Sequence, residues 1–285
     1  MNKTILFLLI PILSLILSPL VHAETRQHGG FVALSVEDLK HELARQKLHN
    51  EVFLLRSLPA DFPDIRDANE KKQLFMQVML PIILAENQRL AEQRALAKLM
   101  IPHKGERRLG NQPADLWLKK VLTRYRIKHG GIITPALGKQ LLRRLDTVPP
   151  RMALAQAAIE SGWGTSRFAL EGNSLFGQWT WAKGSGLTPS ERDDGESHAV
   201  KAFHTLRSSV RAYLLNLNAN PAYAEFRALR AQLRNQGRPA DAHILAAGLR
   251  KYSQRGSAYV QEVRDIINSA DLQSLAVPNL QVARQ

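Results

Sequence analysis

The 285-residue sequence contains no cysteine, so it can form no disulfide bond and offers no thiolate as a nucleophile or metal ligand. Its nine histidines include no His-x-x-x-His or His-Glu-x-x-His pair of the kind that binds zinc. No glycine-rich turn is followed by the Lys-Ser or Lys-Thr of a phosphate loop. These absences argue against cysteine, zinc and nucleotide chemistry, and they predict a protein without a metal or a cofactor.

Acidic residues are also in short supply. There are 25 against 39 basic residues, and the formal net charge is +14. The basic residues are spread along predicted helices, as in Lys119-Lys120 and Arg143-Arg144, and no helix-turn-helix, zinc-finger or ribonucleoprotein signature accompanies them. The composition therefore predicts an anionic polymer or surface as the partner, and no nucleic acid.

Long apolar runs are lacking except near the N-terminus. Lys3 precedes an apolar run from Ile5 to Leu17, and Val21-His22-Ala23 supplies the small residues that signal peptidase prefers. We expect residues 1–23 to be a signal peptide cleaved after Ala23, which leaves a mature charge of 14 − 1 = +13 because Lys3 is the only charged residue removed. As an uncleaved anchor the run would be short for a bilayer span. The expected location is the periplasm or cell envelope of a Gram-negative-like bacterium, without a stable membrane anchor after cleavage.

The remaining chain is patterned for helices. Residues 24–112 are predicted to form a helical N-terminal region that ends in a polar linker. In it, the amphipathic stretch 69–100 contains Pro81, which should kink or split the helix, and its charged residues are expected to form a solvated face. Further helices are expected from Asp115 to Lys128 and from Pro135 to Leu145, with Thr134 as a cap. Residues 276–285 are predicted to be a flexible tail.

One carboxylate occupies an unusual position. Pro149 and Pro150 can open a helix that Gly162 ends, and the small residues between them predict a buried helix with Glu160 in its last turn. The negative end of the helix dipole and burial beside Trp163 would both favour the protonated acid. A glycosidase needs such a group to protonate the departing glycosidic oxygen. The alternative is an ordinary surface glutamate at a helix end.

The surrounding motifs point to a family. The sequence Ala-Gln-Ala-Ala-Ile-Glu-Ser-Gly-Trp-Gly at 155–164, followed by Leu-Phe-Gly at 175–177, closely resembles the glucosaminidase domain of bacterial cell-wall hydrolases, glycoside hydrolase family 73. The resemblance implies a mainly α, lysozyme-like domain over residues 113–275 with a small antiparallel β lobe. It also implies cleavage of peptidoglycan after N-acetylglucosamine, with Glu160 as the catalytic acid. Ser174 stands where the family usually has Asn.

Two further catalytic candidates come from the same resemblance. The segment 189–195 resembles an element that carries a second acidic residue, which here is Glu191, although Arg192 replaces a common aromatic. Glu191 could be catalytic or could only help to form the lobe, and Glu196 is the fallback. Tyr252 matches a tyrosine that lies near the acid, where it could position the sugar's acetamido group or could simply cap the core. Tyr259 is expected in the core because it has helical spacing from hydrophobic residues.

Four aromatic residues are candidates for stacking on sugar rings. Trp179 and Trp181 lie two residues apart in a predicted strand and so share one face, which makes them the better candidates. Trp163 and Phe176 could bind substrate or could equally pack in the core.

The N-terminal region resembles that of bacterial Bax-type proteins in the segments Lys71-Lys72, 80–84 and Asn87. We therefore predict an exported peptidoglycan hydrolase that acts on glycan strands. A lytic transglycosylase, an amidase and a non-catalytic envelope-binding protein are the alternatives. A transglycosylase should show a Gly-Leu-Met-Gln-like element, and an amidase should show zinc ligands or a cysteine, none of which is evident.

Overall fold

The computed structural model describes residues 30–49, 54–180, 184, 186–188 and 199–275, and most of them are helical. The longer helices are α2 (Val36–His49), α3 (Ala68–Met100), α4 (Pro113–Arg124), α5 (Pro135–Arg144), α6 (Pro150–Ser161), α8 (Leu206–Ala219), α9 (Ala224–Asn235) and α11 (Ser257–Asn268). The short ones are α7 (Arg167–Gly172), α10 (Ala242–Ala246), α12 (Ala270–Gln273), η1 (Phe62–Asp64), η2 (Pro221–Tyr223) and η3 (Ala247–Leu249). No helix in these ranges combines the length and apolarity of a membrane span.

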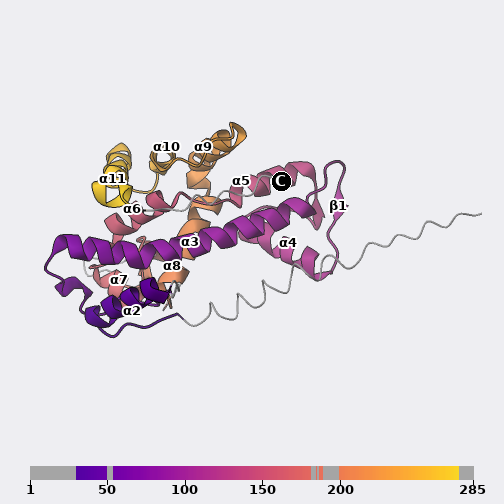
Figure 1. Cartoon of the computed structure of the whole chain (residues 1–285). Coiled ribbons are helices and arrows are strands. Elements are labelled where there is room, and N and C mark those ends of the chain that lie inside the picture. Colours follow the sequence, from indigo (N-terminus) through magenta and orange to yellow (C-terminus); the bar gives the residue numbers. More distant parts are fainter. Residues whose placement is uncertain (1–29, 50–53, 181–183, 185, 189–198, 276–285) are drawn as a thin grey trace, which may run out of the picture.

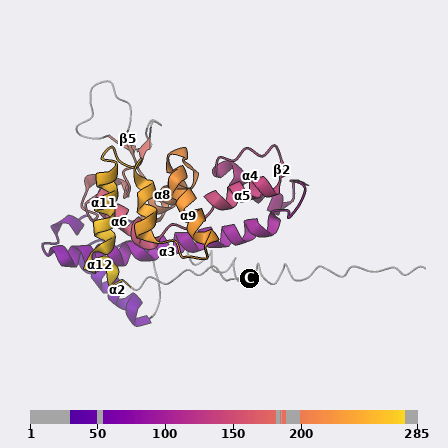
Figure 2. The ribbon, with the colours of Figure 1, turned by 90° about the horizontal axis from the view of Figure 1, so that it is seen from above.

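Two small antiparallel sheets complete the fold. Strands β1 (Arg107–Arg108) and β2 (Ile132–Ile133) form one sheet. The other has the order β3-β5-β4, from strands β3 (Trp179–Thr180), β4 (Gly186–Leu187) and β5 (Ala199–Lys201). The latter is the β lobe, and it projects from the helical body on the side away from α3 (Figure 2). The prediction of a mainly α fold with a small antiparallel lobe is confirmed.

Helix α3 runs along the molecule, with α9, α10 and α11 on one side of it and α2 and α7 on the other (Figure 1). Asp67 caps its start by accepting hydrogen bonds from the amides of Asn69 and Glu70. The helix continues through Pro81, so the predicted split is absent. Packing of α3 against α6 and α8 offsets the roughly 3 kcal/mol that an interior proline costs. Helix α3 therefore belongs to the same hydrophobic core as the C-terminal helices.

The prediction that the charged residues of α3 form a solvated face is wrong for Glu86 and Arg94, which are both buried. Glu86 lies 2.8 Å from Arg89, 2.6 Å from Arg207 and 2.8 Å from Arg211, the last two on α8. Burial alone would raise the pKa of Glu86, but the three guanidinium groups outweigh it and lower the pKa to about 2. Glu86 thus holds α8 against α3.

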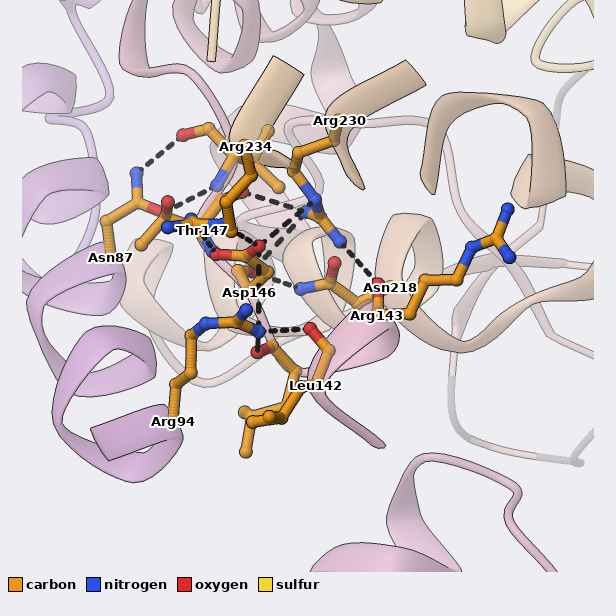
Figure 3. Close-up of polar contacts among 11 residues, drawn as sticks. Asn87, Arg94, Leu142, Arg143, Asp146, Thr147, Asn218, Arg230 and Arg234 are labelled. Carbon is orange, nitrogen blue, oxygen red and sulfur yellow. Dashed lines mark hydrogen bonds and ion pairs between the residues drawn. The ribbon is translucent and has the colours of Figure 1, made fainter. Parts of the chain in front are cut away.

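A second buried carboxylate, Asp146, lies in the loop that joins α5 to α6 (Figure 3). Its oxygens lie 2.5 Å from Arg234, 3.6 Å from Arg94 and 3.8 Å from Arg230. The side chain of Asn218 on α8 donates to the Asp146 carbonyl at 2.8 Å. This cluster joins α3, α8 and α9 around the loop.

Side chains from other helices also hydrogen-bond to the backbone of this loop and of the end of α5. Arg94 donates to the carbonyls of Leu142 and Leu145, and Arg230 donates to that of Thr147 at 2.8 Å. The Asn87 side chain pairs with Val148 in both directions, at 2.8 and 2.9 Å. Because the loop ends where α6 begins, these contacts fix the position of the helix that carries Glu160.

Helix α6 is rich in alanine and largely buried. Its alanines are fully buried, and it packs on α3 and α11. Pro150 opens the helix, and Gly162 ends it in the left-handed conformation at φ 57° and ψ 48°. The amide of Trp163 then donates to the Ala158 carbonyl at 2.8 Å, as expected at a glycine-capped helix end. The predicted start and stop of this helix are confirmed.

Candidate active site

Glu160 lies in the last turn of α6, and its side chain is partly buried. Burial raises its pKa, against the opposing effects of a hydrogen bond from Tyr259 and the charge of Arg255, while the charge of Glu262 raises it further. The net shift favours the protonated acid. An acid that holds its proton is what proton donation to a leaving group requires.

The Leu-Phe-Gly turn lies directly against this carboxyl group. Gly177 has φ +57°, and a Cβ atom built there would lie 3.2 Å from Oε2 of Glu160. Glycine adopts this conformation without strain and leaves room for the carboxyl oxygen. The fold thus brings together the two halves of the sequence motif, which are separated by α7.

Phe176 anchors this turn. Its side chain is buried, and its ring stacks on Tyr213 with centroids 3.9 Å apart. The preceding amide, that of Leu175, donates to Ser209 Oγ on α8 at 3.2 Å. A buried, stacked ring has no face free for a sugar, so the structure supports the packing alternative for Phe176.

Tyr252 also reaches the turn. Its hydroxyl donates to the Phe176 carbonyl at 2.9 Å, and its ring stacks on Tyr259 at 5.5 Å. Burial raises the pKa of Tyr252 well above its usual value, with a further contribution from the charge of Glu160. A neutral Tyr252 therefore packs against the core and lies in the aromatic cluster beside Glu160, so the two sequence-based alternatives are compatible.

Sequence reasoning placed Tyr259 in the core, and it is buried there. The sequence did not indicate that Tyr259 lies close enough to Glu160 to lower the pKa of the acid, or that buried Gln156 donates to the Tyr259 hydroxyl at 2.8 Å. Tyr213 in turn donates to Gln156 at 2.7 Å. The sequence feature that could have predicted this contact is Gln156, the one side-chain amide in an alanine-rich helix. It lies four residues before Glu160 and therefore on the same face of the helix.

Trp163 lies at the junction with α3. Its ring meets Phe75 edge to face at 5.9 Å, and Lys72 Nζ lies 5.4 Å from the ring centroid. The next residue, Gly164, has φ +83° and fits closely against Leu58 and Phe75. These contacts dock the turn after α6 onto α3. A sugar contact by the partly buried Trp163 stays a prediction.

Trp179 is an exposed aromatic residue in the described part of the β lobe. It pairs with Val200 across the β3–β5 ladder, and 54% of its surface is accessible. Its role as a sugar platform stays a prediction. The other lobe candidates, Trp181, Glu191 and Glu196, lie outside the described residues.

In the described part of the chain, no group of three or more histidine, aspartate or glutamate side chains could hold a metal ion. The site as described is thus an acid with a raised pKa, a glycine turn against it and a surrounding cluster of neutral tyrosines.

Comparison with known proteins identifies the family of the domain that carries this site. Residues 138–272 match the glucosaminidase family model, described as mannosyl-glycoprotein endo-beta-N-acetylglucosaminidase. This match and the observed architecture confirm the predicted lysozyme-like glucosaminidase domain. It spans the α6 helix, the turn, the β lobe and the tyrosine cluster.

Two relatives are informative. The chain is 32% identical to Protein bax of Escherichia coli strain K12 over 204 residues, which are 70% of this chain and 71% of that protein. It is 36% identical to Peptidoglycan hydrolase FlgJ of the same strain over 101 residues, which cover 31% of this chain and about a third of FlgJ. No solved structure gives a significant match. The chain therefore belongs to the family of bacterial Bax-type proteins that carry a glucosaminidase domain.

Proposed function

We propose that this protein is a peptidoglycan hydrolase that cleaves the β-1,4 bond after N-acetylglucosamine, with Glu160 as the general acid. The observation that carries the proposal is a single carboxyl group whose pKa burial raises, held against the glycine of the Leu-Phe-Gly turn. The glucosaminidase match and the relationship to FlgJ, a protein named as a peptidoglycan hydrolase, support this substrate class.

The chemistry begins with proton transfer. The glycosidic oxygen takes the proton of Glu160 as its bond to the anomeric carbon breaks, and an oxocarbenium-like state develops on the sugar. Neutral tyrosines around Glu160 add no competing charge. A basic chain also suits the substrate, because peptidoglycan carries lactyl and peptide carboxylates.

The second half of the reaction has two routes. An inverting enzyme needs a base about 6.5–9.5 Å from the acid to activate water, and Glu191 is the candidate. In substrate assistance, the sugar's own 2-acetamido group attacks the anomeric carbon, and Tyr252 would orient it. The Tyr252 hydroxyl hydrogen is engaged by the Phe176 carbonyl, so Tyr252 would contact the acetamido group through its oxygen or after that bond opens.

Digestion of purified peptidoglycan sacculi tests the proposal. The wild-type protein should release fragments whose borohydride-reduced ends are N-acetylglucosamine by mass spectrometry, and Glu160→Gln should release none. Anhydromuramic ends would indicate a lytic transglycosylase, and freed peptides an amidase. Cleavage by neither protein, with sacculi still bound, would indicate a non-catalytic binder.

Glu171→Gln provides a matched control. Glu171 is an exposed carboxylate on α7, paired with Arg167 at 3.3 Å. The substitution makes the same chemical change at an exposed side chain close in sequence to Glu160, so its digestion products should equal those of the wild type.

We also propose export to the periplasm or cell envelope, on the basis of the predicted signal peptide. The sequence around Ala23 supports cleavage there. The intact mass of the protein purified from envelope fractions should correspond to a chain that begins at Glu24. A cytoplasmic, full-length product would contradict export.

A further inference from the structure

The segment 116–145 carries positive charge only. It has Lys or Arg at eight positions and neither Asp nor Glu, and six of the eight side chains are exposed. The flanking carboxylates are engaged elsewhere: Asp115 pairs with Arg107 at 2.7 Å, and buried Asp146 is surrounded by arginines from α3 and α9. In the described part of the chain, no carboxylate pairs with any of the six. Together they form the basic face: Lys120, Arg124, Arg126, Lys128, Lys139 and Arg143.

The basic face is built where α4 and α5 end. On each of these helices it has two basic side chains four residues apart, which therefore lie on the same side of the helix. Arg144 donates to the carbonyls of Tyr125 and Arg126, at 2.6 and 3.1 Å, and so joins the end of α5 to the end of α4. Burial lowers the pKa of Arg227 on α9 to about 10, with contributions from the charges of Arg144 and Arg143. Positive charge thus accumulates at this junction.

The basic face lies far from the candidate acid. Gly138 on α5 packs directly on Ile101, which follows the last residue of α3. Trp163, three residues after Glu160, meets Phe75 near the start of α3. At about 1.5 Å per residue, these two contact points are about 40 Å apart along α3. Both views show α4 and α5 beside the C-terminal part of α3, and α6 and α11 nearer its N-terminal part (Figures 1 and 2). The basic face is therefore separate from the catalytic site.

The composition of this surface indicates the chemistry of its partner. In the range 113–145, which the structure describes throughout, Trp117 is partly buried and Tyr125 is buried, so no exposed ring is available to stack on a nucleic-acid base. Leu116 is the one exposed large apolar residue in this range, whereas a helix that inserts into a lipid surface needs an apolar face.

The spacing of the charges points to a polymer. Neighbouring charges on each helix are roughly 6 Å apart along its axis, and long Lys and Arg side chains can each reach a separate anionic group. A polymer with single carboxylates along its length matches such a surface. Peptidoglycan, with the carboxylates of its peptides, is a polymer of this kind.

We propose that the basic face is a second peptidoglycan-binding surface, which holds peptide carboxylates of the wall while the site at Glu160 acts on a glycan strand. The inference rests on the proposed function, because it takes peptidoglycan as the substrate. Two contact surfaces on one polymer raise the effective concentration of the sugar chain at the catalytic site. The basic face should therefore lower KM for the intact wall and leave kcat unchanged.

The test measures co-sedimentation of the full-length mature protein with purified sacculi. All proteins carry Glu160→Gln, so that the polymer stays intact during the measurement. The face variant adds Lys139→Glu and Arg143→Glu. The control adds Lys47→Glu and Arg66→Glu, two exposed residues on α2 and just before α3. Both pairs lower the net charge by the same amount, so they separate the basic face from the total charge.

The face variant should bind sacculi at least about 10-fold more weakly, because each surface charge is worth a factor of about 1.5–5 in affinity. The control should stay within about 2-fold of the protein with the basic face intact. Added salt should weaken binding less in the face variant than in the control. Sacculi whose carboxylates are amidated with ethanolamine should bind the control as weakly as the face variant. With Glu160 restored, the face variant should show a KM for sacculi raised about 10-fold and an unchanged kcat.

Equal losses of binding in the face variant and the control would overturn the inference, since total charge would then explain them. Face-dependent binding to phosphatidylglycerol vesicles, with unchanged binding to sacculi, would overturn it in favour of a membrane surface. If the face variant does not fold by circular dichroism, Lys139→Gln with Arg143→Gln decides.

The two proposals can fail separately. Face-dependent binding to sacculi, together with no cleavage by the wild type, would support the basic face and refute the hydrolase. Normal cleavage, with binding to sacculi unchanged in the face variant, would refute the basic face and support the hydrolase.

Discussion

Replacing Asp146 by Asn should destabilise the protein strongly, although the two side chains have nearly the same shape. One Asp146 oxygen faces three guanidinium groups: Arg234 at 2.9 Å, Arg94 at 3.6 Å and Arg230 at 3.8 Å. An amide NH2 at that position would face donors alone. An amide oxygen there would keep the bond from Arg234 Nε but lose the charge, and the NH2 would then replace Oδ1, which accepts from Arg234 Nη2 and from the Thr147 amide.

The size of the effect follows from burial. Arg94 and Arg230 are buried, and desolvation already lowers the pKa of Arg230 to about 10. Removing one partner of a buried ion pair costs about 3–5 kcal/mol. We expect this range in total, because Arg234 is partly exposed and can turn toward water. For a domain of this size it corresponds to a fall in Tm of about 6–20 °C.

Thermal unfolding followed by circular dichroism measures the change. Glu171→Gln is again the control, since it breaks an exposed pair of the kind worth about 0.3–0.5 kcal/mol and should lower Tm by no more than about 2 °C. If Asp146→Asn lowered the free energy of unfolding by less than about 1 kcal/mol, the buried arginines would not depend on this carboxylate and the reasoning would fail.

Three further predictions concern the site and its support. Gly177→Ala should reduce turnover at least about 10-fold and have a smaller effect on Tm. The added Cβ atom would lie against the Glu160 carboxyl group, and the backbone at this position has a positive φ. Steady-state digestion measures the change in turnover, and thermal unfolding measures the change in Tm. Glu86, with its pKa lowered to about 2 from 4.5, should contribute stability that is fully present above pH 4.5 and lost as the pH falls toward 2. Glu86→Gln should therefore be less stable at neutral pH and show a weaker dependence of Tm on pH in that interval, and equal slopes would contradict this assignment. Trp179→Ala should raise KM for sacculi with little change in kcat, and an unchanged affinity in a pull-down assay would argue against a sugar platform on β3.

The candidate acid and its helix could be predicted from the sequence because their signals are local. Prolines and glycines fix where α6 starts and stops, and the alanine-rich stretch between them indicates burial. A carboxyl group at the end of such a helix is unusual enough to attract attention without any tertiary information. The small antiparallel lobe was expected only through the resemblance of the motifs to a known family.

The buried charges could not be predicted in the same way. Glu86 and Arg94 fit an amphipathic helix pattern, in which charged residues ordinarily face water. Their burial depends on partners from α8 and from the α5–α6 loop, far away in sequence. Likewise, the helical spacing of Tyr259 from hydrophobic residues predicted a core residue, and no local pattern showed that its hydroxyl accepts a hydrogen bond from Gln156.

The sequence by itself thus determined the candidate acid and where its helix lies, since these depend on spacing and on backbone preferences over a few residues. Only the tertiary structure decided how that acid is tuned. Gln156, Tyr213 and Tyr259 come from three different helices, and Asp146 and Glu86 acquire their arginines from α3, α8 and α9. A pKa or a hydrogen-bond direction depends on distance and burial in space, and a one-dimensional pattern specifies neither.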